Sequence, residues 1–271
     1  MTVFEMLKYP FIVRAIVVGT AVALCAALLG VSLVLKNYSM MGDGLSHVGF
    51  GALAVAVPLN VAPLTLALPV VTAAAFLLLH LKDDGRLKGD GALALLSTGS
   101  LAFGVLVLSM TTGMNTDVCN YLFGTILSMS HTDVRLSLIL SVLVVTVFVL
   151  CYNRIFSITF DEEFAQAAGL NVKFYNTLIA VLTSMVIVLG MRLMGALLIS
   201  GLIVIPAVSA MILCKRFRMV TLMAALISLV CFNVGIYCSY RWATPAGAGI
   251  VACNFIVLFG AKIYDVIKVG E

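Results

Sequence analysis

The feature that most constrains this chain is a series of eight or nine apolar runs, each about as long as a helix that crosses a bilayer. Hydrophobic residues make up 63% of the 271 residues and charged residues only 10%, whereas soluble domains carry about 25% charged residues. The sequence therefore predicts an all-α integral membrane protein, a polytopic bundle of eight or nine transmembrane helices that forms one domain over residues 1–271. The runs lie near residues 11–35, 39–60, 61–80, 92–110, 133–151, 174–191, 194–213, 219–240 and 247–265.

Several classes of protein do not fit this sequence. Helix-length apolar runs argue against a transmembrane β-barrel, whose strands alternate apolar and polar residues. No basic cluster has the density that nucleic-acid binding requires, so no nucleic-acid partner is expected. The patterns GxxxxGK[ST] and HExxH are absent, which leaves ATP binding by a phosphate loop and zinc-protease chemistry unsupported. We expect the chain not to be an enzyme.

The positions of lysine and arginine predict the orientation of the chain in the membrane. Most of the 16 basic residues lie in segments that a nine-helix arrangement places on one side, chiefly residues 82–88, 152–173 and 215–218 and the C-terminal tail. The positive-inside rule assigns that side to the cytoplasm, so the N-terminus is expected outside. The polar stretch 111–132 then lies on the outer side, where a short interfacial helix is expected.

Asp43 and His47 are the ionisable pair that most strongly suggests a function. They stand four residues apart at the start of the second apolar run, so on a helix both side chains emerge on one face. Ionisable groups within membrane segments are costly and by default mark functional sites. A carboxylate and an imidazole make half of a transition-metal site, whose other ligands would come from another helix, a second subunit or water. The alternatives are an N-cap role for Asp43 and a satisfied buried histidine at position 47.

The connection after the fifth run predicts a short helix. Thr159 and Glu162 have the spacing of a capping box, and Glu162 and Glu163 place negative charge at the positive end of the helix. Gly169 can adopt the left-handed conformation that ends it. Such a helix, with Ala165 on a small-residue face, is suited to dock on another protein. An ordinary capped loop helix without a partner is the alternative.

Four stretches resemble the permease subunits of bacterial ABC importers for zinc, manganese and iron. They are SMMGDGLSHVGFGALAVAV, NYLFGTILSMSHTD, MRLMGALLISGLIVIPAVSA and TPAGAGIVACNFIVL, and they follow one another in the same order as in that family. The resemblance covers residues 11–258 and is closest in kind to a zinc permease. It implies a multi-pass protein of the bacterial cell membrane.

The resemblance also implies partners and residue roles. Permeases of this family work as a homodimer that contacts membrane lipid, carries two cytoplasmic ATPase subunits and receives its cargo from an extracytoplasmic metal-binding protein. Asp43 and His47 fall on the family's GDxxSH motif, which implies that they coordinate metal in the channel. The stretch DEEFAQAAGL, within about residues 160–169, corresponds to the coupling helix, with Ala165 and Gly169 on its Ala…Gly pattern.

The chain departs from the family pattern at two places. Ala243 stands where many members carry an acid two residues before the proline of the TPAG-like stretch, so a carboxylate role at that position is lost. Phe50 and Gly51 stand where some members have Leu-Pro, so a helix kink at that point is expected to be absent.

We therefore expect the permease subunit of an ATP-driven importer that moves a divalent transition metal into the cytoplasm, with ATP hydrolysed on a separate chain. Zinc is favoured over manganese and iron because imidazole suits it. No cofactor is expected to be bound permanently, since the metal is cargo. The residues assigned to ATPase coupling are Glu162, Glu163, Ala165 and Gly169.

Two readings of another class are open. The first is a proton- or sodium-coupled secondary metal carrier that acts without an ATPase and uses Asp43 and His47 as a proton relay. The second is an intramembrane metalloenzyme, which the missing catalytic motifs disfavour.

Overall fold

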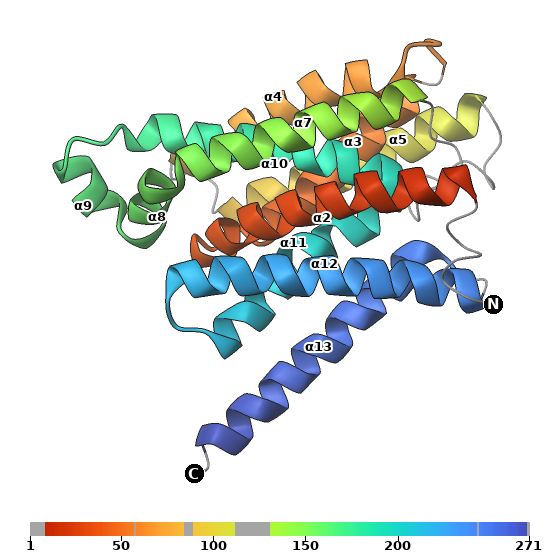
Figure 1. The fold of residues 1–271 in the computed structure, drawn as a ribbon. Helices are drawn as coiled ribbons and strands as arrows, with labels where there is room; N and C mark the ends of the chain where they lie inside the picture. The colour runs from red at the N-terminus through yellow and green to blue at the C-terminus, as the bar shows by residue number, and fades with distance from the viewer. Residues whose placement is uncertain (1–8, 57, 84–88, 112–130, 243, 270–271) are drawn as a thin grey trace.

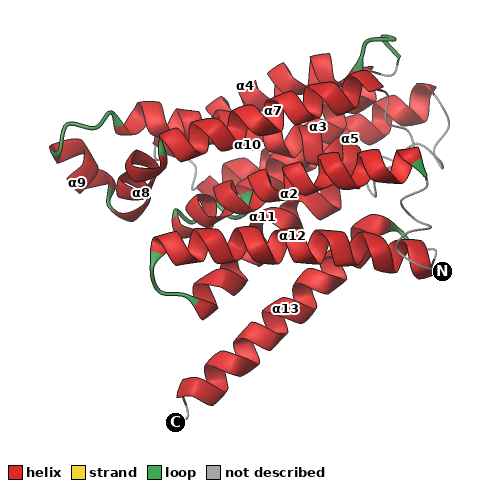
Figure 2. Cartoon of the chain, in the orientation of Figure 1, coloured by secondary structure: helices red, strands yellow, loops and turns green. Residues whose placement is uncertain are grey.

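The computed structural model describes residues 9–56, 58–83, 89–111, 131–242 and 244–269, and every regular element in these ranges is a helix (Figures 1 and 2). Two short helices, α8 (Tyr152–Phe160) and α9 (Glu162–Ala167), lie between α7 and α10. The interfacial helix predicted within 111–132 falls almost entirely on residues outside the described ranges. The long described helices are α2 (Pro10–Leu35), α3 (Met41–Ala56), α4 (Pro63–Asp83), α5 (Gly89–Thr111), α7 (His131–Leu150), α10 (Val172–Met194), α11 (Ala196–Leu213), α12 (Phe217–Trp242) and α13 (Ala246–Val269).

These helices form a membrane-type bundle, as the apolar runs predict. In the described part of the chain, seven helices are long and apolar enough to span a bilayer. The other two, α3 and α11, have 16 and 18 residues, fewer than the roughly 20 that a bilayer requires. They are enclosed by protein rather than lipid, because α3 contacts α4, α5, α10 and α11, while α11 also contacts α2, α12 and α13. The predicted eight or nine spans are thus seven full-length helices and two shorter, inner ones.

The second predicted span is shorter than expected at both ends. Residues 39–60 were expected to span, but α3 covers Met41–Ala56 and is followed by a turn in which Asn60 has a φ of 50°. Helical structure continues through Phe50 and Gly51, as the absence of the Leu-Pro pair predicts. A Cβ at Gly51 would lie 2.8 Å from the carbonyl oxygen of Ser100 on α5. The glycine therefore allows the close backbone approach that is common between membrane helices.

The helix α2 runs through the middle of the bundle, between α7 and α10 on one side and α11 and α12 on the other (Figure 1). In contrast, α13 packs against α11 and α12 and then slopes away from the other helices. Its outer surface is apolar and well exposed, with Ile256, Phe259, Ile263 and Ile267 all more than half exposed. Such a surface matches the hydrocarbon interior of a bilayer.

The turn that joins α2 to α3 is short and internally hydrogen-bonded. Lys36 is the C-cap of α2, and Asn37 follows it in the left-handed region with a φ of 58°. The amide of Tyr38 donates to the carbonyl of Leu33 at 2.8 Å, and the amide of Asn37 donates to that of Val34 at 3.1 Å. This pair of bonds is a Schellman motif, which fixes the direction in which the chain leaves the helix.

Candidate metal site and coupling helix

Asp43 and His47 project from adjacent turns of α3, as their spacing predicts. The Nε2 atom of His47 lies 3.7 Å from Oδ2 of Asp43, which is too far for a direct hydrogen bond. Two ligand atoms each about 2.1 Å from one metal can be at most about 4.2 Å apart, so a single ion can bridge this gap. The Asp43 side chain is 45% exposed and the His47 side chain is 14% exposed. The arrangement suits a partly accessible site with two protein ligands.

Neither alternative role for these two residues fits the structure. Asp43 lies inside the first turn of α3, which begins at Met41, so it is not the N-cap, although its charge still favours the helix N-terminus. The Nδ1 atom of His47 is buried and has no hydrogen-bond partner among the described residues. His47 is therefore not a satisfied buried histidine. A buried polar atom without a partner commonly has a functional explanation.

No further metal ligands gather at this pair within the described residues. Groups of three or more His, Cys, Asp or Glu side chains that could hold a metal do not occur in that part of the chain. Ala243, at the position of the missing acid, lies outside the described residues. The structure thus brings together Asp43 and His47 and adds no third ligand from the described helices.

The short helix predicted after the fifth apolar run is present as α9, but its cap is a different residue. Thr159 is not the N-cap, because α8 continues through Phe160 and keeps Thr159 buried inside a helix. The chain becomes extended only at Asp161, whose Oδ1 accepts the amide of Phe164 at 2.9 Å. Asp161 therefore caps α9, and the predicted 160–169 helix is the six-residue helix Glu162–Ala167 followed by a turn. Gly169, with a φ of 85°, adopts the predicted left-handed conformation.

The small-residue face of α9 points toward the protein. Ala165 is 1% exposed and forms a small core with Ile158 of α8 and Tyr175 of α10. Phe164 is 67% exposed, and Glu163 is also exposed. The surface available to another protein therefore carries an aromatic and an acidic side chain, while Ala165 sets how closely α9 packs against its own chain.

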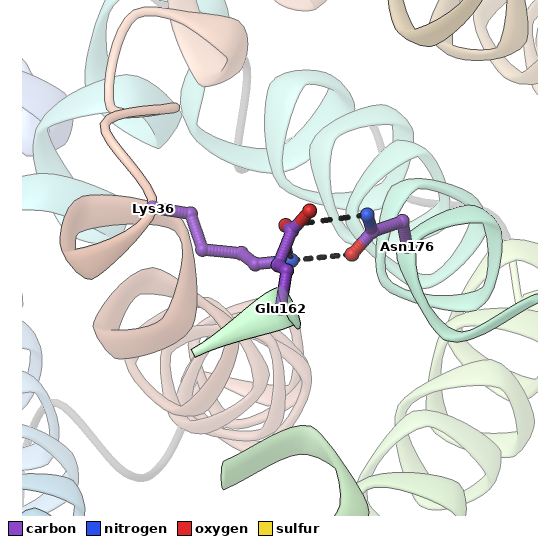
Figure 3. Close-up of polar contacts among 3 residues, drawn as sticks. All are labelled: Lys36, Glu162 and Asn176. Carbon is purple, nitrogen blue, oxygen red and sulfur yellow. Dashed lines mark hydrogen bonds and ion pairs between the residues drawn. The ribbon is translucent and has the colours of Figure 1, made fainter. Parts of the chain in front are cut away.

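Glu162 is held by a contact that the sequence patterns did not reveal. Its carboxylate lies 2.7 Å from Nζ of Lys36 at the end of α2. Asn176 of α10 joins both groups, because its oxygen accepts from Lys36 and its amide nitrogen donates to Glu162 at 3.4 Å (Figure 3). In the sequence, Lys36 is a single basic residue directly after the first apolar run. Nothing in the sequence pairs it with a residue so distant in the chain.

Two further polar contacts fasten the ends of α10. Near its start, Arg154 of α8 donates to the hydroxyl of Tyr175 at 2.5 Å, and this bond raises the pKa of the guanidinium. At its other end, Arg192 forms a 2.8 Å ion pair with Asp133 in the first turn of α7. Both contacts attach α10 to the segment that precedes it in the chain.

Comparison with known proteins identifies the family. The ABC 3 transport family (ABC-3) matches residues 8–265. The chain belongs to this family. It is 26% identical to the manganese transport system membrane protein MntC of Listeria monocytogenes over 96% of this chain and 92% of that protein. It is 28% identical to the high-affinity zinc uptake system membrane protein ZnuB of Haemophilus influenzae, over 89% of this chain and 92% of ZnuB.

Further comparisons extend the range of cargo and support the fold. The ABC-3 chain is 28% identical to the chelated iron transport system membrane protein YfeD of Yersinia pestis, over 97% of this chain and 89% of YfeD. It also superposes on a solved structure, PsaBC from Streptococcus pneumoniae in complex with Fab, with a TM-score of 0.86 and 24% identity, covering 96% of this chain and 93% of that one. This structural likeness confirms the fold.

Family membership settles the coarse function. The protein is the multi-pass membrane subunit of a bacterial metal ABC importer and is not itself catalytic. ABC-3 permeases work with ATPase and binding-protein partners, which excludes the reading as a secondary carrier that acts without an ATPase. The intramembrane metalloenzyme is excluded because the membrane subunit of such a transporter is not itself catalytic.

Proposed function

We propose that this ABC-3 permease passes manganese or zinc across the membrane by way of a transient site at Asp43 and His47. The observation that carries the proposal is the 3.7 Å separation between the carboxylate and the imidazole on one face of an enclosed helix. A site with few protein ligands suits transport, because an ion held by a complete cage would leave slowly. Water or a second subunit completes the coordination.

Two observations bear on whether the cargo is manganese or zinc. The imidazole of His47 suits zinc, whereas the carboxylate of Asp43 suits manganese at least as well. The names of related permeases include manganese, zinc and chelated iron, and manganese names are the most frequent. The zinc preference from the sequence rests on one ligand only, so both metals belong to the proposal.

The proposed assembly follows the family pattern. Two copies of the permease each present α9 to one cytoplasmic ATPase subunit, and an extracytoplasmic protein delivers the metal. In this assembly Glu163 and Phe164 face the ATPase, whereas Glu162, Ala165 and Gly169 hold α9 in place. The same arrangement sets the α9 end of the bundle on the cytoplasmic side, where the positive-inside rule also places it.

The test is transport by the complete complex in proteoliposomes. The permease, its ATPase and its binding protein are reconstituted, and ATP-dependent uptake of radioactive manganese and zinc is measured separately and in competition. We expect saturable uptake of at least one of the two metals, blocked by an excess of the other if both use one path. Absence of ATP-dependent uptake of either metal would overturn the proposed cargo.

A further inference from the structure

The cation at the end of α2 is buried in a largely apolar setting. The Lys36 side chain is only 5% exposed, whereas that of its partner Glu162 is 48% exposed. Apart from Tyr38 and Asn176, the space beside Lys36 is lined by apolar residues: Leu33, Met41, Leu79, Ile179 and Ala180. A buried ammonium group is costly unless it is paired and hydrogen-bonded. Glu162 supplies the charge and Asn176 the acceptor (Figure 3). The three side chains form a compact network, here called the Lys36 clamp.

The clamp joins α9 to the turn that leads into α3. Glu162 is the first residue of α9, the helix proposed to face the ATPase. Lys36 is the C-cap of α2, and the turn after it leads directly into α3, which carries Asp43. Helix α9 otherwise packs against α8 and α10. The Lys36–Glu162 ion pair therefore reaches from the coupling helix to the segment that positions the candidate metal site.

The turn between the clamp and the metal site is braced along its length. The Schellman bonds tie Asn37 and Tyr38 to the last turn of α2. The amide of Met41 donates to the carbonyl of Tyr38 at 2.9 Å, and the amide of Gly44 donates to that of Met40 at 3.1 Å. These bonds tie Asn37 and Tyr38 to the end of α2, and Tyr38 and Met40 to the start of α3. A segment fixed in this way carries a displacement onward instead of absorbing it.

We propose that Lys36 is a positioning residue that couples the ATPase to the metal site. When the ATPase moves α9, Glu162 draws Lys36 with it, and the braced turn shifts the first turn of α3 and so changes the position of Asp43 relative to its neighbours. Asn176 keeps the ion pair aligned by bonding to both partners. This proposal rests on the proposed function, because it requires Asp43 to lie on the metal path.

The test measures metal transported per ATP hydrolysed by the complete complex in proteoliposomes, with Lys36→Met, Glu162→Gln and the double variant. We expect the ATPase to co-purify with each variant and to hydrolyse ATP, while the uptake per ATP falls about two- to thirtyfold, the range of coupling changes seen for single residues. The double variant should lose no more than either single variant, because both remove the same link.

The matched control is Lys173→Met, which removes an exposed lysine near Asn176 at the start of α10. This variant should leave the uptake per ATP unchanged. Glu162→Gln replaces the carboxylate with a neutral amide of nearly the same size, which removes the ion pair with little change in volume. Its ratio therefore decides the question even if Lys36→Met fails to assemble. A wild-type ratio in Glu162→Gln would overturn the clamp, as would equal losses of ATP hydrolysis and uptake. Failure of the proposed function would look different, since the unaltered complex would then move neither metal.

Discussion

The Nε2 atom of His47 lies 3.7 Å from Oδ2 of Asp43, one turn apart on a helix that other helices enclose. If the two atoms bind one ion in passing, removal of either should slow transport. We expect Asp43→Asn and His47→Gln each to lower metal uptake by at least about tenfold, in keeping with the cost of weakening a metal site. The measurement is uptake by the reconstituted complex.

A histidine outside the pair provides the control for this first prediction. His80 is exposed near the end of α4, so His80→Gln should leave uptake unchanged. Wild-type uptake in both Asp43→Asn and His47→Gln would contradict the assignment of the site.

The cap of α9 should matter for binding of the ATPase. Replacing Asp161 with Ala removes the 2.9 Å bond to the Phe164 amide and should cost about 1 kcal/mol of helix stability. Because α9 has only six residues, that loss should fray it, and less ATPase should co-purify. The control is Asn171→Ala, which removes the corresponding bond at the start of the 23-residue α10. Equal ATPase recovery from the two variants would argue against docking through α9.

Phe164 should be the main contact with the ATPase. It is 67% exposed on α9, and large aromatic side chains often dominate the energy of an interface. We expect Phe164→Ala to weaken ATPase binding by about tenfold or more, measured by titrating the detergent-solubilised permease with the ATPase. Phe174→Ala is the comparison, because Phe174 is 57% exposed at the start of α10. A larger loss of ATPase affinity in Phe174→Ala than in Phe164→Ala would place the docking surface on α10 instead.

The packing of α3 against α5 depends on a missing side chain. A Cβ at Gly51 would meet the Ser100 carbonyl oxygen at 2.8 Å, whereas a Cβ at Gly99 on α5 would meet nothing within 4 Å. Gly51→Ala should therefore destabilise the protein by about 1–3 kcal/mol through overpacking. Gly99→Ala should be neutral or stabilising, because alanine favours the helix. Thermal unfolding in detergent measures both, and equal Tm values would show that the backbones yield without cost.

The helices were predictable because a bilayer imposes both length and composition. Each predicted run overlaps one of the long helices, and the largest difference in length is at α3, where the helix ends at Ala56 before the predicted run does. The same apolar pattern could not show that α3 and α11 are enclosed, since lipid and protein interior both select apolar side chains. The spacing of Asp43 and His47 predicted their shared face because an i,i+4 relation is local.

The contacts between distant residues were not predictable in the same way. Lys36 and Glu162, or Asp133 and Arg192, meet only because the fold brings together residues that are far apart in the chain. The capping error has a local cause: Thr159 and Asp161 are both good N-cap residues, and the choice between them depended on how far α8 continues. Burial of Ala165 likewise depends on α8 and α10, which no pattern within α9 could show.

Helix α10 is held by a polar contact near each of its ends, here called its anchors. Asn176 joins the Lys36 clamp and Arg192 pairs with Asp133, and at 1.5 Å per residue the two anchors are about 24 Å apart. If such a rod tilts by about 10° about one anchor, the other moves by about 4 Å, more than the 2.8 Å that separates Arg192 from Asp133. A tilt of α10 that keeps one anchor and leaves α7 in place would therefore break the other anchor, which links changes at the two ends of this helix.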